Sequence, residues 1–364
     1  HRKETILSFL IIMEPAENSN STEGQEDFFV VWTDTAQAYK DEEGRKRVNN
    51  FLVHKTIGWG SFAKVKAVTR FSQGENNEQI FEDPYAMKVI HKPVLKKQRA
   101  VRYDVQGNMQ IITELEKVYI EINIWSRVNH PNVIRLYEVI DDESHDYLYL
   151  VMELAEGGQL MNWCPEKEQY DLNEEVFKHV CLNRLKIGET EVKIDNVALR
   201  ERAAREIFRD LAQGIDHLHS KMIVHRDLKH ENIVYSFQHN QTKLTDFTVS
   251  SALENEETRC HDTEGTPAFT APECTVVMTE GYKPKPIDAW SFGICLFSYL
   301  FNKLPFYAES ELQIQIDVKE KDLHIPEGAT PELNGLIQKL LSKDPCKRPT
   351  FTELVSDPWF SISA

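Results

Sequence analysis

The residues best suited to chemistry form one run, Val224–Asn232, which reads Val-His-Arg-Asp-Leu-Lys-His-Glu-Asn. Asp227 carries a carboxylate that can orient a hydroxyl group and accept its proton, and Lys229 adds a cation two residues later. Asn232 and Asp246 supply oxygen ligands of the kind that Mg²⁺ prefers. Phosphoryl transfer needs this combination, because its catalysis rests on positioning and charge compensation. The sequence therefore predicts that this run serves phosphoryl transfer.

Taken alone, each of these residues could be an ordinary loop residue without a catalytic role, since His, Asp, Lys and Asn are common in solvated loops. Their joint occurrence with a downstream Asp-Phe pair, an upstream glycine-rich turn and a strand lysine is not explained in that way. Residues 51–360 resemble protein kinases, whose catalytic loop and Asp-Phe-Gly motif match Val224–Asn232 and Asp246–Thr248.

The resemblance implies an α+β, two-lobed kinase fold with ATP and Mg²⁺ in the cleft between the lobes. We expect residues 51–153 to form the N-lobe, a small antiparallel β-sheet with one key helix, and residues 154–360 to form a mostly helical C-lobe. Residues 1–50 should be a largely disordered extension, because they are acidic and polar, with an apolar island at Phe28–Trp32 that docks on the small lobe. Residues 361–364 form a tail.

A glycine-rich stretch, Gly58–Val65, follows the strand expected at Phe51–Ile57. Its glycines let backbone N–H groups approach phosphate closely. Kinases carry a third glycine where this chain has Ala63, a change that costs flexibility rather than a functional group. By resemblance, the ATP-binding residues are Ile57, Gly58, Trp59, Gly60, Ser61, Phe62, Ala63, Val65, Ala86, Lys88, Met152, Glu153, Ala155 and Val234.

Lys88 lies in a short alternating strand, Tyr85–Ile90. A strand lysine usually faces solvent, but the resemblance to the kinase Val-Ala-Ile-Lys strand implies that Lys88 reaches the nucleotide phosphates and pairs with a helix glutamate. Glu114, Glu116 and Glu121 compete for this role. We select Glu121, because kinases place this residue nine positions before the His of the His-Pro-Asn that opens the next strand.

The hinge between the lobes is expected at Glu156–Gly158, after the strand Tyr147–Ala155. By resemblance, Met152 is the gatekeeper at the back of the nucleotide pocket. Backbone groups of Glu153 and Ala155 would then bind adenine.

The segment after the Asp-Phe-Thr motif ends in Gly-Thr-Pro and Ala-Pro-Glu, which are typical of Ser/Thr kinases. By resemblance, Thr266 should bridge Asp227 and Lys229. Asp288 opens an apolar helix, and we expect its carboxylate to hold the backbone of the catalytic loop. Arg348 should pair with the Glu of Ala-Pro-Glu.

Three residues are regulatory candidates, Arg226, Asp262 and Thr263. Asp262 stands four positions before Thr266, where many kinases carry a phosphorylated residue that pairs with the Arg before the catalytic Asp. Asp262 is thus either a built-in substitute for phosphate or a solvated loop acid beside Glu264. Thr263 is a possible phosphorylation site.

Thr248 stands where kinases almost always carry Gly. Glycine lets this backbone swing into an inactive arrangement through positive φ, whereas a β-branched residue disfavours that region. We therefore expect the flipped, inactive state to be less populated than it would be with Gly.

The wording of Tyr85–Lys92, a basic insert at residues 91–113 and the wording of Asn132–Asp142 resemble one subgroup, the calcium/calmodulin-dependent protein kinase kinases, which activate other kinases. Protein substrates, among them other kinases, are the partners that this implies. The insert is either a docking site for a partner or a solvated basic loop. We expect no calmodulin-binding segment after the domain, because the chain stops just past Trp359.

Two further stretches differ in periodicity. Residues 163–196 are polar and poorly periodic, which predicts a surface insertion. The next stretch should be a helix that carries the catalytic loop, because apolar residues recur there at helical spacing. They are Ile207, Phe208, Leu211, Ile215 and Leu218.

Composition excludes several classes of protein. With 42 basic and 58 acidic residues the net charge is −16, which argues against nucleic acid or an anionic membrane as the main partner. The six cysteines form no close pairs, so we expect neither a zinc site nor a disulfide framework, and a reduced cytoplasmic location fits best. No apolar run is long enough for a membrane span, and we discount the signal-like start at residues 1–12 because no cleavage site follows.

An active Ser/Thr protein kinase is therefore the main hypothesis. The alternative is a pseudokinase, a scaffold or allosteric binding module with little or no turnover. The full set of catalytic and metal-binding candidates favours the enzyme: Lys88, Glu121, Asp227, Lys229, Asn232 and Asp246. A small-molecule kinase is disfavoured by the Gly-Thr-Pro and Ala-Pro-Glu motifs, which shape a peptide site.

Overall fold

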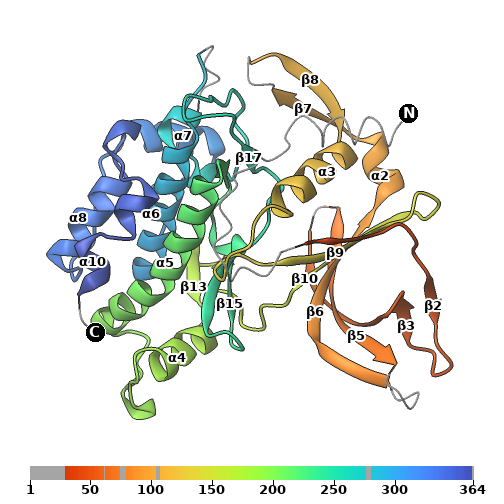
Figure 1. The fold of residues 1–364 in the computed structure, drawn as a ribbon. Helices are drawn as coiled ribbons and strands as arrows, with labels where there is room; N and C mark the ends of the chain where they lie inside the picture. The colour runs from red at the N-terminus through yellow and green to blue at the C-terminus, as the bar shows by residue number, and fades with distance from the viewer. Residues whose placement is uncertain (1–28, 61, 74–78, 104–106, 276–279, 363–364) are drawn as a thin grey trace, which may run out of the picture.

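Two lobes make up the molecule, and Figure 1 shows a curled β-sheet with few helices beside a larger, mostly helical lobe. The computed structural model describes residues 29–60, 62–73, 79–103, 107–275 and 280–362. This architecture confirms the two-lobed α+β kinase fold expected from the sequence.

An eight-stranded sheet forms the smaller lobe, in the order β1-β9-β10-β6-β5-β4-β3-β2. Neighbouring strands are antiparallel, except that β1 runs parallel to β9. Both faces of strand β10 are covered, which explains why its sequence is a nearly continuous apolar run. On one face, Leu148 and Leu150 pack into the main core. On the other face, Tyr149 and Val151 pack into a second core. The strands are β1 (Val31–Thr33), β2 (Ala38–Lys40), β3 (Lys46–Val48), β4 (Phe51–Trp59), β5 (Ala63–Gln73), β6 (Gln79–His91), β9 (Leu136–Asp141) and β10 (Tyr147–Glu153).

Strands β1–β3 narrow the expectation that residues 1–50 are largely disordered, because they place three short stretches between residues 31 and 48 in the sheet. The described part of the apolar island lies on the small lobe as expected, with Val31 opposite Glu138. The Thr33 hydroxyl donates to the Glu138 carboxylate over 2.7 Å. Local composition could not reveal this order, since the pairing partner is a sheet edge about a hundred residues away in sequence. Residues 1–28 lie outside the described residues.

The basic insert at residues 91–113 is folded, which corrects the interpretation as a loop. After the last residue of β6 it forms a short helix, α2 (Lys92–Lys97), and a hairpin of β7 (Arg99–Tyr103) and β8 (Met109–Thr113). Lys92 is buried, with its ammonium 2.8 Å from an Asp141 carboxylate oxygen and 2.6 Å from the Asp142 carbonyl oxygen. The first basic residue of the insert is therefore structural, whereas Arg99 and Arg102 on the hairpin are exposed.

Helix α3 (Glu114–Trp125) is the expected key helix of the small lobe. Thr113 begins it with a capping box, in which the Thr113 side chain accepts from the Glu116 backbone N–H and Glu116 reaches back to the Thr113 N–H. Trp125 at the other end is buried in the same core as Leu136, and its indole N–H donates to the Ile134 carbonyl over 2.7 Å. Both ends of the helix are thus tied down.

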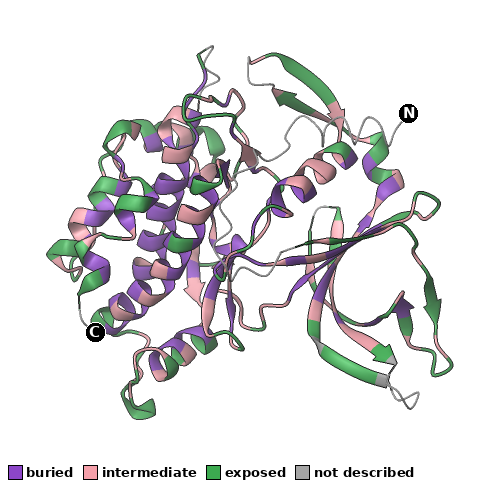
Figure 2. Ribbon diagram, viewed as in Figure 1, coloured by how far each residue is buried: buried purple, intermediate pink, exposed green. Residues whose placement is uncertain are grey.

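The larger lobe is organised around two buried helices. Figure 2 shows that α5 and α6 form the interior of this lobe. Almost every side chain of α6 is buried, as expected for a helix that is apolar all round. None of the described helices is long and apolar enough to cross a membrane. The helices are α4 (Glu174–Asn183), α5 (Val197–Ser220), α6 (Lys285–Phe301), α7 (Glu311–Glu320), α8 (Pro331–Leu340), α9 (Phe351–Leu354) and α10 (Pro358–Ser361), with single turns η1 (Glu189–Glu191), η2 (His230–Asn232), η3 (Pro267–Phe269), η4 (Pro272–Cys274) and η5 (Pro345–Lys347).

Short strands frame the catalytic loop. β11 (Gly158–Gln159), β15 (Ile233–Ser236) and β16 (Gln241–Leu244) make a three-stranded sheet, and β14 (Ile223–Val224) pairs with β17 (Ser251–Ala252). The catalytic loop runs from β14 to β15, so a pairing on each side fixes where it begins and ends.

Residues 163–196 are folded and partly buried, so they do not lie wholly on the surface as expected. They contain most of a hairpin, β12 (Met161–Cys164) with β13 (Gln169–Leu172), followed by α4 and its N-cap Asn173. The residues of α4 that pack into the core are separated by one and three positions, a helical pattern that the surrounding polar residues obscure. They are Val176, Phe177, Val180 and Cys181.

Candidate active site

A buried ion pair joins the sheet of the small lobe to α3. The Lys88 ammonium lies 2.7 Å from a Glu121 carboxylate oxygen. Of the two competing glutamates, Glu116 is used in the capping box and Glu114 stands in the first turn of α3. Burial alone would lower the pKa of Lys88, but attraction to Glu121 and Asp246 outweighs it and raises the pKa. Lys88 is therefore a fixed cation.

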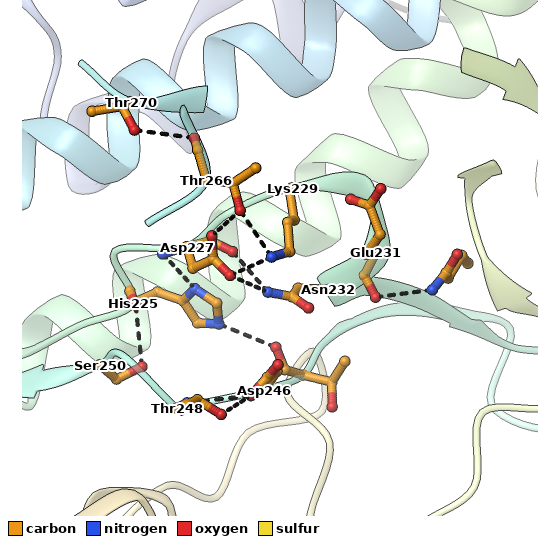
Figure 3. A network of polar contacts seen from close by, with 12 residues as sticks. His225, Asp227, Lys229, Glu231, Asn232, Asp246, Thr248, Ser250, Thr266 and Thr270 are labelled. Carbon is orange, nitrogen blue, oxygen red and sulfur yellow. Dashed lines mark hydrogen bonds and ion pairs between the residues drawn. The ribbon is translucent and has the colours of Figure 1, made fainter. Parts of the chain in front are cut away.

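Asp227 and Lys229 of the catalytic loop form a closed triangle with Thr266 of the activation segment, seen in Figure 3. The Thr266 hydroxyl donates to one Asp227 carboxylate oxygen over 2.7 Å, and the Lys229 ammonium donates to Thr266 over 2.9 Å. Lys229 also lies 2.6 Å from the second Asp227 oxygen. The structure thus brings together the three residues that the sequence analysis placed in one site.

Asn232 fixes the same carboxylate from the far end of the loop. Its side-chain amide donates to the Asp227 carbonyl oxygen over 2.8 Å and to an Asp227 carboxylate oxygen over 3.2 Å. Both bonds use the amide nitrogen, so the amide oxygen of Asn232 takes part in neither of them.

Asp288, on α6, holds the backbone of this loop, as expected. Its two carboxylate oxygens accept the backbone N–H groups of His225 and Arg226 over 3.0 and 2.8 Å, and His219 lies 2.8 Å away. Burial alone would raise the pKa of Asp288, but the hydrogen bond and charge of His219, together with the contacts to His225, hold the pKa below its ordinary value. Arg226 has a φ of 69°, so this anchor also holds a strained backbone conformation.

The Asp-Phe-Thr motif follows β16 and faces the loop. Phe247 is fully buried, stacked on Trp125 with ring centroids 5.9 Å apart and an angle of 20° between planes. Asp246 has a φ of 68°, and its carboxylate accepts from Thr248. Burial alone would raise the pKa of Asp246, but Lys88 and the hydrogen bonds from Thr248 outweigh it and hold the pKa below its usual range.

The donor set fits magnesium. Asp246 offers an ionised carboxylate and Asn232 an amide oxygen, both hard ligands. Among the described residues no cluster of three or more His, Cys, Asp or Glu side chains could hold a metal without other ligands. Two protein ligands suit Mg²⁺ when nucleotide phosphates complete its coordination.

The residues expected around ATP lie on adjacent strands and at the hinge. Across the sheet, Val65 is opposite Lys88, and Ala86 is opposite Met152. The glycine-rich turn is closed by the Gly60 N–H, which donates to the Ala63 carbonyl over 2.9 Å. Ile57, Gly58 and Trp59 end β4, and Phe62 and Ala63 lie on the other side of this turn. Ser61 lies outside the described residues.

The hinge is held against the larger lobe by a close backbone approach. Gly157 donates its N–H to the Tyr235 carbonyl over 2.9 Å, and a Cβ on Gly157 would lie 2.8 Å from that oxygen, so a larger residue would clash. The Glu153 side chain turns toward Lys243, 2.8 Å away, which leaves only backbone groups of Glu153 for a nucleotide. Val234 lies on β15, the strand that pairs with β11 just past the hinge.

Two acidic residues of the activation segment form ion pairs with basic residues. Arg226, almost fully buried, forms an ion pair with Asp262, and its second nitrogen donates to the Ser251 hydroxyl over 2.9 Å. Glu264 forms an ion pair with Lys117 of α3. Thr263 lies between these two acids in the sequence. Its side chain is exposed and is not part of either ion pair.

Sequence reasoning missed Lys117, Tyr170 and Glu231. Lys117 stands four residues before Glu121, so helical spacing alone could have placed both on one face of α3. Tyr170 of β13 donates its hydroxyl to the Glu231 carboxylate over 3.1 Å and so joins the catalytic loop. No local signal marked Tyr170, because its role depends on the folding of a hairpin.

Comparisons with known proteins agree on one family. The profile of the Protein kinase domain family matches residues 51–360. Serine/threonine-protein kinase GRIK1 of Arabidopsis thaliana is 29% identical over 88% of this chain and 69% of its own length. Serine/threonine-protein kinase ssp1 of Schizosaccharomyces pombe is 32% identical over 87% of this chain, and CBL-interacting protein kinase 31 of Oryza sativa is 29% identical over 87%. The chain spans 43% of the length of the yeast relative and 58% of that of the rice relative.

Replacing Asp288 with Ala should destabilise the protein by about 3–5 kcal/mol, because two buried backbone N–H groups and a His lose their partner. Urea unfolding monitored by fluorescence measures this loss. Asp195→Ala, which removes an exposed carboxylate, is the matched control and should stay within about 0.5 kcal/mol of the wild type.

The stabilisation by Asp288 should also depend on pH. A carboxylate whose pKa is lower in the folded state stabilises above its unfolded pKa of about 3.9 and loses this effect as pH falls toward the folded pKa. The difference between wild type and Asp288→Ala should therefore shrink below about pH 4. A variant within 1 kcal/mol of the wild type at neutral pH would contradict the anchoring role.

Proposed function

This chain belongs to the protein kinase family, and we propose that this ATP-dependent Ser/Thr protein kinase acts upstream of other kinases, by phosphorylating their activation segments. The observation that carries the enzymatic part is the closed triangle of Asp227, Lys229 and Thr266, set beside the Lys88–Glu121 pair. The upstream role is supported by the subgroup resemblance and by the folded insert beside α3.

Each residue of the site has a task that its contacts suit. Asp227 orients the substrate hydroxyl and accepts its proton, since its two oxygens are held by Thr266 and Lys229. Lys229 balances charge on the transferred group, and Lys88, fixed by Glu121, holds the nucleotide phosphates. Asn232 and Asp246 would hold Mg²⁺, which neutralises phosphate charge when bound.

A scaffold without turnover is not favoured. Contacts between the candidate catalytic groups support the proposal: Asp227 contacts Thr266 and Lys229, and Lys88 contacts Glu121. The named relatives in the comparison are also protein kinases.

The hairpin β7–β8 suits docking of a substrate kinase. On one face of the hairpin, Val101 lies opposite Ile111 and both are exposed, at 47% and 67%. Met109 is exposed on this face too, and Arg99 lies at its base. Exposed apolar side chains edged by a cation fit an apolar partner surface with acidic residues at its rim.

The activation segment suits activity without phosphorylation. Asp262 forms an ion pair with Arg226, and Glu264 forms one with Lys117. These two carboxylates thus make the ion pairs that a phosphate group would otherwise make. The second pair also ties the segment to α3, which carries Glu121. The enzyme would then be controlled by docking or abundance rather than by modification of Thr263.

A reducing compartment such as the cytoplasm suits this protein. All six cysteines are free thiols, and four of them are buried. Disulfides would be expected in an oxidising compartment.

The first prediction separates Asp227 from Asp246. Asp227→Asn should lower kcat by about 10²–10⁴-fold with nearly unchanged affinity for ATP, because nucleotide contacts do not run through it. Asp246→Asn should weaken ATP binding when magnesium is present. Calorimetry with and without Mg²⁺ measures both affinities, with Asp322→Asn, an exposed acid, as the control. Equal magnesium-dependent affinity in wild type and Asp246→Asn would refute the assignment.

The second prediction concerns activation. Phosphatase-treated wild type should keep most of its turnover, as should Thr263→Ala. Asp262→Ala should lose about tenfold, Arg226→Ala a similar amount, and the double variant little more, because both changes break one ion pair. Glu254→Ala, an exposed acid in the same segment, is the control. Loss of turnover on phosphatase treatment alone would show that a modified residue activates the enzyme.

The third prediction tests the docking face and the substrate class together. In an assay on intact kinases and on peptides from their activation segments, Val101→Ser with Ile111→Ser should raise KM for intact kinases about tenfold and leave KM for short peptides unchanged. Ile80→Ser, which removes an exposed apolar side chain from β6, should change neither value.

Equal loss on both substrates would contradict a docking role for the hairpin. Phosphorylation of Ser/Thr peptides without any preference for activation segments would contradict the upstream role and leave the kinase activity itself standing.

A further inference from the structure

We propose that the Thr248 hydroxyl is a positioning group, which holds the Asp246 carboxylate in the arrangement that binds metal; this rests on the kinase function proposed above. The hydroxyl donates to the Asp246 Oδ1 atom over 2.5 Å, and the Thr248 backbone N–H reaches the same oxygen over 3.2 Å. Figure 3 shows the two side chains turned toward each other. Glycine, the usual residue at this position in kinases, has no hydroxyl to donate.

The two bonds determine which oxygen of Asp246 is left for a metal. Both end on Oδ1, so Oδ2 receives neither of them. A carboxylate held at one oxygen loses rotation about its Cβ–Cγ bond, and its second oxygen then keeps one direction. Binding a metal should cost less when this order is already present.

The same bonds offset a backbone strain. Asp246 has a φ of 68°, in the left-handed region that residues with a side chain seldom adopt. Such a conformation persists only where neighbouring contacts hold it. A hydroxyl bond from the residue two positions on is a local contact of this kind, and it is lost when Asp246 turns away.

The hydroxyl also lies next to the carboxylate that pairs with Lys88. Thr248 Oγ1 is 3.4 Å from Glu121 Oε2, whereas Lys88 lies beside the other oxygen, Oε1. One hydroxyl therefore stands between a carboxylate of the small lobe and one of the larger lobe. Rotation of Asp246 away from the site, or of α3 away from the sheet, would break a contact to it.

Packing does not explain the residue. Thr248 is exposed, so its methyl group fills no cavity, and its φ is outside the left-handed region. The β-branch and the hydroxyl are thus two separable properties. Thr248→Val keeps the branch and removes the hydroxyl, whereas Thr248→Ser keeps the hydroxyl and removes the branch.

Binding of an inhibitor that selects the flipped Asp-Phe state, measured by calorimetry on protein free of metal and nucleotide, tests the proposal. Thr248→Ser should bind it within twofold of the wild type, because the hydroxyl, and not the β-branch considered in the sequence analysis, resists the flip. Thr248→Val should bind it about tenfold more tightly, and Thr248→Gly at least as tightly. Thr352→Val is the matched control, because it removes another exposed hydroxyl that donates to an aspartate, over 2.7 Å, and should leave the affinity unchanged.

Magnesium gives a second readout. The Mg²⁺ concentration that half-saturates nucleotide binding should rise about tenfold in Thr248→Val and stay within twofold of the wild type in Thr248→Ser. Equal values for Thr248→Val and wild type in both measurements would overturn the proposal, as would Thr248→Ser behaving like Thr248→Val. Absence of inhibitor binding by every variant would overturn it too.

These measurements need no turnover, so they separate this proposal from the proposed function. A wild type that shows the expected order of inhibitor affinities and yet transfers no phosphate would overturn the kinase function alone. A wild type that transfers phosphate while Thr248→Val and Thr248→Ser match it in inhibitor and magnesium affinity would overturn the role of Thr248 alone.

Discussion

The active site depends on one electrostatic constraint: the carboxylates of Glu121 and Asp246 have like charges and lie close to the same cation, Lys88. Burial and the nearby charge of Asp246 raise the pKa of Glu121, although attraction to Lys88 opposes this rise. The Lys88 ammonium attracts both carboxylates. In a poorly hydrated site such charges interact strongly, so the carboxylates can stay ionised only while the cation is held in place.

The framework around the site follows from this constraint. Lys88 is fixed because its strand pairs on both sides within the sheet, and Glu121 is fixed because α3 is capped at Thr113 and anchored by Trp125. In the larger lobe, Asp288 holds the loop that carries Asp227. A strand of the sheet, helix α3, the buried start of α6 and the catalytic loop therefore bring charged side chains of both signs to one place.

The chemistry of the site could be predicted from the sequence more completely than the structure around it. The catalytic loop and Lys88 are recognisable because their spacing is short and the order of their roles is constrained by the reaction. Choosing Glu121 needed a count to the next motif, and the structure places it beside Lys88. Lys117 could have been found in the same way, from its place on the same helix face.

The structure around the site was harder to predict, because its order comes from contacts that local composition does not show. β1 is ordered by the edge of β9, the hairpin β7–β8 by pairing within a stretch rich in cations, and α4 by a core that its polar neighbours conceal. Thr248 shows a second limit: its β-branch is visible in the sequence, but its hydrogen bond to Asp246 is a property of the folded backbone.

A crystal structure with Mg²⁺ and a non-hydrolysable ATP analogue would test most directly whether this set of charged residues is the active site. We predict a nucleotide between the glycine-rich turn and the hinge, metal ligated by Asn232 and Asp246, and Lys88 on the phosphates with its bond to Glu121 intact. A nucleotide bound elsewhere, or a metal that leaves Asp246 unligated, would contradict this view of the molecule.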